Sequence, residues 1–177
     1  MNIEIMDATP GDALGIIKVF HDTWLATYPN KEHGVSLEDI EYYLKDDFSM
    51  KEIETLEQNI KDMPSNRKRL VAKIGNTIVG TCTAMKNEDY NHVRALYVLP
   101  EFQNNKIGVM LWNKADEFFD HTKDTIVQVA EYTEQAIHFY KKLGFIDTGK
   151  RIQDESERLQ SGSIIIDMEM IKKARCR

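Results

Sequence analysis

Residues 98 to 109 read Val98-Leu99-Pro100-Glu101-Phe102-Gln103-Asn104-Asn105-Lys106-Ile107-Gly108-Val109, and this stretch decides the fold. An apolar strand is predicted before Pro100, and an amphipathic helix is predicted a few residues after it. The first turn of a helix has unpaired backbone N–H groups and the positive end of the helix dipole, which together suit a diphosphate. Gly108 has no Cβ, so we expect phosphate oxygens to approach the backbone there. The stretch contains neither GxxxxGKS/T nor GxGxxG, which excludes a P-loop and a dinucleotide-binding turn.

Outward from this turn, the hydrophobic pattern predicts alternating strands and helices. The first helix opens at Thr9-Pro10 and is predicted to bury a face that includes Leu14. Gly75-Asn76 suits a two-residue hairpin turn, and the polar stretch 153–162 is predicted to be a solvated loop. Strands are predicted at 2–6, 70–74, 77–85, 92–99, 125–130, 145–151 and 163–171, and helices at 9–28, 36–44, 49–63, 104–119 and 134–143.

The order of these elements is β-α-α-α-β-β-β-α-β-α-β-β, in which an antiparallel meander leads into a β-α-β crossover. This order predicts an α/β (α+β) fold, in which a mixed, mostly antiparallel central sheet is flanked by helices on both faces. The length of 177 residues fits one domain, spanning residues 1–177, and no linker or internal repeat divides the chain.

Composition and charge indicate which kinds of partner the protein is expected to bind. No apolar run approaches the ~18 residues that cross a bilayer, and the N-terminus does not resemble a signal peptide, so we expect a cytoplasmic protein with no membrane partner. The net charge of −6 argues against nucleic acid and is compatible with a cationic partner. The five histidines and the two cysteines, Cys82 and Cys176, show no metal-ligand spacing, and a disulfide between the cysteines is not expected.

The decisive stretch also resembles a known family motif. Val98, Pro100, Gln103 and Gly108 match the pattern V-x-P-x-x-Q/R-x-x-G-x-G/A, which is the cofactor-binding motif of the GNAT superfamily of N-acetyltransferases. Lys106 stands where this family usually has its first glycine. A lysine there can still donate its backbone N–H, and its ammonium is able to face a phosphate, but a left-handed backbone costs more than with glycine.

A second segment resembles the same superfamily. The stretch Ala136-Ile137-His138-Phe139-Tyr140-Lys141-Lys142-Leu143-Gly144-Phe145 is similar to the family pattern A-x-x-F-Y-x-x-x-G-F. Thr133 stands where the family commonly has asparagine. The N-cap of the last helix and contact with the cofactor are equally good interpretations of Thr133.

The resemblance implies that acetyl-CoA binds between the strands 92–99 and 125–130, which splay apart. Backbone groups of the first strand would hold the pantetheine arm, and a backbone N–H near Val98 would stabilise the developing oxyanion. The residues implied for the pantetheine are Leu96, Tyr97 and Val98, and those implied for the pyrophosphate are Gln103, Asn104, Asn105, Lys106, Ile107, Gly108 and Val109.

The resemblance also implies the chemistry, which is attack of a neutral amine on a thioester. Tyr140 matches the family's tyrosine acid, because a neutral phenol can protonate the leaving thiolate; a core aromatic residue is the alternative. The base that deprotonates the amine stays open. Glu131, at the end of its strand, is favoured over Glu88 and Asp89 in a turn.

Trp24 and Tyr28 share a helical face where the family frames its acceptor site, and their rings are able to stack on a cation or to pack against the next helix. Together with Lys106-Ile107-Gly108, the pattern Trp24…Tyr28-Pro29 is similar to the PaiA-like spermidine/spermine acetyltransferases. We therefore expect a small-molecule primary amine, such as a polyamine, as the acceptor. Acetylation of a protein or peptide and a non-catalytic acyl-CoA-binding sensor are the alternatives, and a homodimer stays open.

Overall fold

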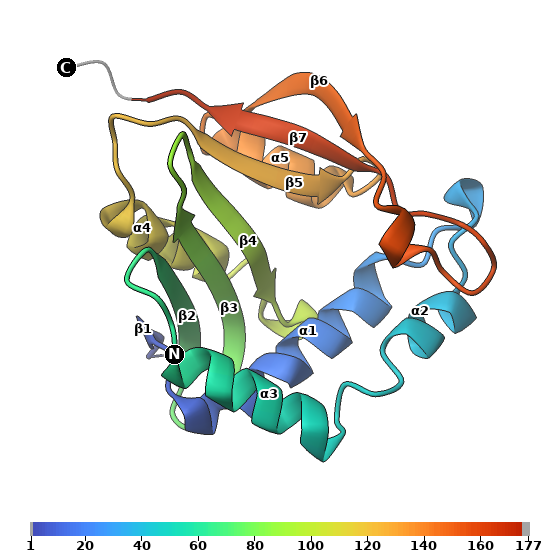
Figure 1. The fold of residues 1–177 in the computed structure, drawn as a ribbon, viewed down its shortest axis with the longest axis horizontal. Helices are drawn as coiled ribbons and strands as arrows, with labels where there is room; N and C mark the ends of the chain where they lie inside the picture. Colours follow the sequence, from blue (N-terminus) through green and yellow to red (C-terminus); the bar gives the residue numbers. More distant parts are fainter. Residues whose placement is uncertain (1, 175–177) are drawn as a thin grey trace.

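The computed structural model describes residues 2–174, and its centre is a seven-stranded sheet in the order β1-β2-β3-β4-β5-β7-β6 (Figure 1). Neighbouring strands are antiparallel except β4 and β5, which are parallel. This topology confirms the predicted mixed, mostly antiparallel sheet. The strands are β1 Glu4–Asp7, β2 Arg67–Ile74, β3 Thr77–Lys86, β4 Asn91–Val98, β5 Thr125–Ala130, β6 Ile146–Ile152 and β7 Asp167–Lys172.

Helices cover both faces of the sheet, as predicted. Gly80 of β3 faces Leu111 of α4. Its neighbour Thr81 lines a surface cavity together with Ile16 and Ile17 of α1. Because successive strand residues point to opposite faces, α1 and α4 lie on opposite sides. Within residues 2–174, none of these helices is long and apolar enough to span a membrane. The helices are α1 Ala13–Thr27, α2 Leu37–Tyr43, α3 Met50–Lys61, α4 Ile107–Phe118 and α5 Glu134–Lys142, with 3-10 turns at Pro10–Asp12, Lys31–His33, Pro100–Phe102 and Glu155–Glu157.

The buried stripe of α1 differs from the prediction at Leu14, which is 54% exposed. A 3-10 turn separates Thr9 from α1, and the helix itself starts at Ala13. The stripe is therefore set by Ala13, Ile16 and Ile17, which are buried at helical spacing. Leu14 was wrongly placed in the core because it falls between these positions, on the solvent side.

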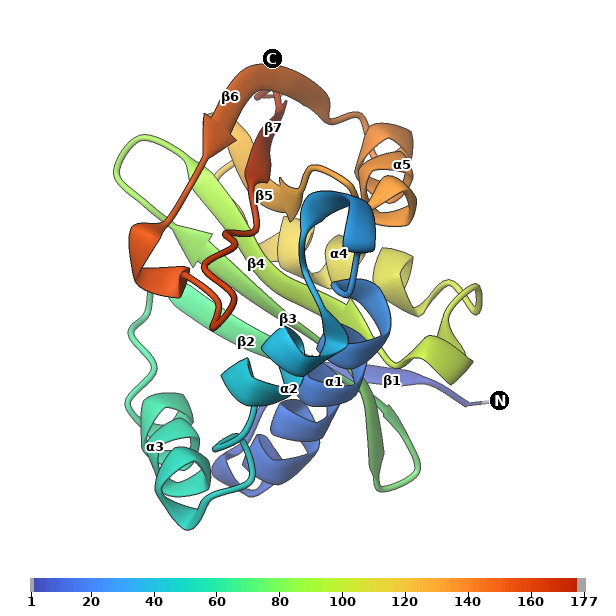
Figure 2. The same ribbon diagram turned by 90° about the vertical axis from the view of Figure 1, so that its right-hand side faces the viewer.

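The stretch 153–162 is not the fully solvated loop that its polar composition predicts. Leu159 is 5% exposed and packs in a small core with Ile40 and Leu44 of α2. The backbone N–H of Ser161 donates to Asp39 Oδ1 at 2.8 Å, which fixes the segment against α2 (Figure 2). One buried leucine and one hydrogen bond are enough to dock this polar stretch.

The hairpin turn was predicted correctly, since Ile74 lies opposite Thr77 across Gly75-Asn76. Cys82 is buried in β3, whereas Cys176 lies outside the described residues.

The feature that positions the site is the short junction between β4 and β5. The two strands pair only where Asn91 to Val93 lie beside Thr125 to Val127. Beyond Val93 the strands diverge, and at Ala95 the φ angle is 50°, where the register with β3 also shifts. The Asn91 side chain holds the junction: its Nδ2 donates to Asp120 O at 2.8 Å, and its Oδ1 accepts from Asp120 N at 3.1 Å. The family resemblance implied this splay between the strands.

Candidate active site

The turn between β4 and α4 presents a row of free backbone donors. Among the described residues, the N–H groups of Asn104 to Val109 meet no hydrogen-bond acceptor; the next N–H, of Met110, donates to Lys106 O at 3.0 Å. Six consecutive free amides at the N-terminus of a twelve-residue helix are suited to an anion. That these residues bind the pyrophosphate stays a prediction.

Two left-handed residues shape the turn. Asn104 has φ 64° and Lys106 has φ 62°, which are not helical. For this reason α4 begins at Ile107, and the predicted start at Asn104 was wrong. Asparagine adopts this backbone region readily, whereas lysine does so at a cost. The side chain of Asn105 secures the turn from within, because its Nδ2 donates to Phe102 O and Gln103 O at 3.2 Å.

Gly108 has a different steric role from the one predicted. A Cβ at this position would lie 3.3 Å from Phe139 Cε2 of α5 and 3.7 Å from Leu96. The missing side chain therefore lets α5 pack closely on α4, and the space is filled by Phe139 rather than left open for phosphate oxygens. The N–H of Gly108 remains one of the free donors.

The end of β4 is tied to both neighbouring elements through its last carbonyl. Val98 O accepts from Gln103 Nε2 at 3.1 Å and from Thr23 Oγ1 of α1 at 3.5 Å. Gln103 Oε1 in turn accepts from Gln135 Nε2 at 3.0 Å, which connects the turn to α5. On its other edge β4 pairs with β3, so the backbone of Leu96, Tyr97 and Val98 has no strand partner toward β5.

Thr133 is the N-cap residue of α5, but its side chain makes no capping hydrogen bond. Its Oγ1 donates instead to Ala130 O at 2.7 Å, and its own N–H bonds to the same carbonyl at 2.9 Å. Thr133 therefore stabilises the turn from β5 into α5. Its contact with a cofactor stays a prediction.

Tyr140 lies deep between the halves of the sheet. It is 5% exposed, and its ring meets Phe139 and Phe145 edge to face. Within the described chain its hydroxyl makes no hydrogen bond, and burial raises the pKa of the phenol well above its usual value. The hydroxyl therefore stays protonated at neutral pH and is free to donate.

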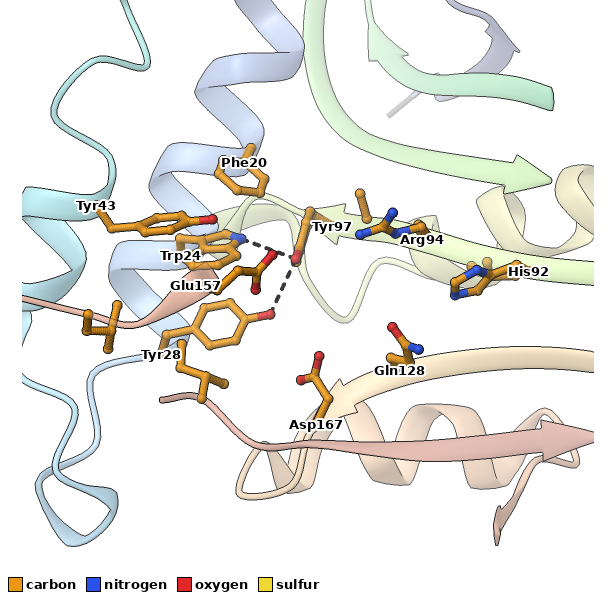
Figure 3. A pocket seen from close by; sticks show the side chains of 14 residues that line it. Phe20, Trp24, Tyr28, Tyr43, His92, Arg94, Tyr97, Gln128, Glu157 and Asp167 are labelled. Atoms are coloured by element: carbon orange, nitrogen blue, oxygen red, sulfur yellow. Dashed lines mark hydrogen bonds between the residues drawn. The ribbon is translucent and has the colours of Figure 1, made fainter. Parts of the chain in front are cut away.

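A cavity of about 300 Å³ opens on the other side of the splay (Figure 3). Five aromatic rings contribute to its wall, and we call it the aromatic cavity. It includes Trp24 and Tyr28, the two residues predicted to bind the acceptor. The full lining is Phe20, Trp24, Tyr28, Tyr43, His92, Val93, Arg94, Ala95, Tyr97, Gln128, Glu157, Leu159, Ile165 and Asp167.

Tyr97 centres the aromatic wall, with its side chain projecting from β4 into the cavity. Trp24 Nε1 donates to the Tyr97 hydroxyl at 3.1 Å, and the Tyr28 hydroxyl lies 3.3 Å from it (Figure 3). Tyr43 of α2 stacks on Trp24 with ring centroids 5.0 Å apart. Trp24 and Tyr28 thus line the cavity and pack against α2 and β4. Their contact with an acceptor stays a prediction.

Two carboxylates, Glu157 and Asp167, reach the aromatic cavity, and the sequence did not single out either of them. The signal available for Asp167 was weak: one acidic residue after Ile164-Ile165-Ile166, at a predicted strand position. Glu157 lies in the stretch expected to be solvated. The bulge at Ala95 gave no signal, because alanine is not favoured at positive φ.

The three predicted bases lie elsewhere. Glu131 Oε2 accepts from Arg151 Nε at 3.1 Å, and Glu131 does not line the aromatic cavity. Glu88 and Asp89 lie in the turn between β3 and β4, also outside the lining. The role of Glu131 as base stays a prediction, and its ion pair with Arg151 holds the carboxylate toward β6.

Comparisons with known proteins show that solved acetyltransferase structures share this fold. The chain superposes on the crystal structure of a PaiA N-acetyltransferase from Thermoplasma acidophilum in complex with coenzyme A, with a TM-score of 0.76 and 25% identity over 98% of this chain and 99% of that one. The ribosomal-protein-S18-alanine N-acetyltransferase of Escherichia coli shares the fold, with a TM-score of 0.67 and 13% identity over 99% of this chain and 96% of that one. A GNAT-family acetyltransferase from Streptococcus pneumoniae does so with a TM-score of 0.63 and 17% identity, covering 97% and 98%. No curated protein sequence matches the chain.

The model of the acetyltransferase (GNAT) family matches residues 25–145, which is more than half of the chain. The match spans the 103–109 turn, the β4–β5 junction and Tyr140. The protein belongs to the acetyltransferase (GNAT) family.

Proposed function

We propose that this protein is an acetyl-CoA-dependent N-acetyltransferase whose acceptor is the primary amine of a small cationic molecule. A polyamine is the most specific candidate for this acceptor. The observation that carries the proposal is one arrangement: six free amides at the start of α4, beside an open edge of β4, next to an aromatic cavity with two carboxylates. The similarity to PaiA N-acetyltransferase supports the polyamine form.

The donor site consists of the 103–109 turn and the open edge of β4. The free N–H groups from Asn104 to Val109 would hold the pyrophosphate, and the ammonium of Lys106 would add a positive charge. The edge of β4 at Leu96, Tyr97 and Val98 that has no strand partner toward β5 would hold the pantetheine arm. Acetyl-CoA supplies an acetyl thioester there.

Two groups of the chain serve the transfer itself. A backbone N–H near Val98 would stabilise negative charge on the thioester oxygen, an effect of roughly 3–4 kcal/mol in other acyl transfers. Tyr140 would give its proton to the leaving thiolate, because its buried phenol is neutral and makes no hydrogen bond within the described chain.

The aromatic cavity suits a cation. Aromatic faces attract an ammonium by about 0.5–2 kcal/mol each, and Trp24, Tyr28 and Tyr97 present three such rings. Glu157 and Asp167 supply negative charge in the same space. A diamine or polyamine would place one nitrogen at the reaction centre and another among these groups.

A panel assay tests the proposal. The protein is incubated with acetyl-CoA and with spermidine, spermine, monoamines or peptides, and release of free CoA is measured. We expect release with spermidine or spermine and little with peptides. Release with peptides alone would replace the small-molecule acceptor by a protein acceptor. CoA binding without release for any amine or peptide would indicate an acyl-CoA sensor.

A further inference from the structure

Asp167 is the first residue of β7 and lies on the wall of the aromatic cavity opposite β4. It pairs with Ala130 across the β5–β7 ladder, so its side chain lies on the same sheet face as Gln128 two residues away. Both residues line the cavity, and Figure 3 shows the Asp167 carboxylate pointing toward Tyr97. The carboxylate therefore faces the open edge of β4, where the thioester is proposed to bind.

This carboxylate has no partner within residues 2–174, where it makes neither a hydrogen bond nor an ion pair. Glu157, the other carboxylate of the lining, also makes no side-chain hydrogen bond or ion pair within these residues, but it is exposed to solvent, whereas Asp167 is half-buried. A half-buried carboxylate without a partner lowers the stability of the fold. A cationic ligand bound in the cavity would supply the missing partner.

Burial also makes this group a better base than an ordinary aspartate. Burial raises the pKa of Asp167 to about 6, with a contribution from Glu157 and an opposing one from Arg94. Its carboxylate is then ionised at pH 7 and still able to take a proton. The titratable and charged groups around it are Arg94, His92 and Tyr97 of β4, Glu157 of the docked segment, Tyr28 after α1 and Tyr132 before α5.

Among these neighbours, no cation competes closely for Asp167. His92 is neutral at pH 7, because burial and Arg94 lower its pKa to about 4. Arg94 acts on Asp167 only as a charge at a distance, since no ion pair joins them. The cavity thus leaves Asp167 available to a cationic ligand.

We propose that Asp167 is the general base of the acetyl transfer and the anchor of the reacting ammonium. This inference rests on the proposed function. The acceptor ammonium gives one proton to the Asp167 carboxylate, and the neutral nitrogen forms a bond to the thioester carbonyl carbon. As the carbon–sulfur bond breaks, the thiolate takes the Tyr140 proton. The second proton lost by the nitrogen restores Tyr140, and the proton on Asp167 passes to solvent.

The placement favours Asp167 over the other carboxylates. Glu131 is held by Arg151 and lies outside the cavity. Glu157 lines the cavity from the docked 3-10 turn, next to Trp24 and Tyr28 rather than beside β5 (Figure 3). Glu157 is therefore suited to a distant ammonium of the acceptor, and Asp167 to the reacting one.

The test compares Asp167→Asn, Asp167→Glu and Glu157→Gln with the wild type, with Glu54→Gln on the exposed face of α3 as the control. For spermidine, the wild-type kcat/KM should rise tenfold per pH unit and level off near pH 6. Asp167→Asn should lose about 100-fold at pH 7 and regain activity continuously toward pH 9, where the free amine becomes abundant. Asp167→Glu should keep part of the activity. Glu157→Gln should raise KM and move the profile slightly to lower pH, because the Glu157 charge helps to raise the pKa of Asp167.

Two further measurements separate failure of the base from failure of the function. Carbon-13 NMR of the protein should show the Asp167 carboxyl titrating near pH 6 and shifting when spermidine is added. CoA binding by calorimetry should be equal in all variants. If the wild type turns over an amine while Asp167→Asn keeps the wild-type rate and pH profile, the base assignment is overturned and the function stands. If the wild type turns over no amine and the Asp167 signal ignores spermidine, both are overturned.

Discussion

The left-handed backbone of Lys106 shows how one residue can cost stability at a binding turn. A side chain at φ 62° costs roughly 1–2 kcal/mol, whereas glycine adopts this region without that cost. Glycine also loses more backbone freedom on folding, which offsets about half of the gain. Lys106→Gly should therefore raise the free energy of unfolding by about 0.5–1 kcal/mol, or Tm by about 2 °C.

Urea unfolding of Lys106→Gly and Lys106→Ala measures this difference. Alanine keeps a Cβ and removes the charge, so Lys106→Ala should gain no stability. Equal stabilisation in both variants would assign the effect to charge instead of the backbone. Because the ammonium is proposed to face the pyrophosphate, both variants should bind CoA a few-fold more weakly.

Tyr140 is a second case in which one atom can be tested in isolation. Its ring packs against Phe139 and Phe145, while its hydroxyl makes no hydrogen bond within the described residues. Tyr140→Phe therefore keeps the packing and should leave Tm and CoA affinity unchanged. If the hydroxyl protonates the thiolate, kcat should fall by about 100-fold or more. Steady-state kinetics and CoA calorimetry check this, and an unchanged kcat would reduce Tyr140 to a core residue.

At the scale of elements, the first turn of α4 allows a charge to be added without damage to the fold. Val109 is 39% exposed and is the third residue of the helix, where an acidic side chain normally stabilises the helix through its dipole. Val109→Glu should therefore fold at least as stably as the wild type. Beside the proposed pyrophosphate, the same charge should weaken CoA binding by about tenfold.

Val109→Gln is the matched control, since it has the same shape without the charge. Calorimetry of CoA binding at two salt concentrations gives the readout, and the defect of Val109→Glu should shrink as salt screens the charge. Full CoA affinity in folded Val109→Glu would place the pyrophosphate elsewhere. Substitution of Gly108 is less informative, because any side chain there meets Phe139.

The elements also show what the sequence can predict and what it cannot. Periodicity and the Gly75-Asn76 turn predicted the seven strands and five α-helices of residues 2–174, because these are local properties of the chain. The two family motifs drew attention to the 103–109 turn and to Tyr140, and the roles of both stay predictions. Docking of Leu159 on α2 was missed, since it depends on contacts between segments more than 100 residues apart. For the same reason the sequence did not reveal Asp167 as part of the aromatic cavity.

At the scale of the whole molecule, the site lies where the two parts of the sheet barely touch. The strands β1 to β4 and β5 to β7 are joined through three residue pairs between β4 and β5, secured by Asn91. The free donors follow the C-terminal end of β4, and the aromatic cavity is lined by residues of β4, β5 and β7. Within residues 2–174, this opening leaves the half-buried carboxylate of Asp167 without a hydrogen bond or ion pair, and this should lower the stability of the entire fold.

The pH dependence of unfolding tests this cost. The folded-state pKa of Asp167, about 6, lies above its usual value of 3.8, so the folded protein binds the proton more tightly than the unfolded chain does. Its contribution to stability is fully present below about pH 4 and is lost as the pH rises through about 6. Asp167→Asn carries no charge at either pH, so it should match the wild type near pH 4 and exceed it by roughly 2 kcal/mol at pH 8. Urea unfolding of both proteins across this pH range measures the difference in their free energies of unfolding. A difference that stays constant with pH would mean that burial of the Asp167 carboxylate does not destabilise the fold.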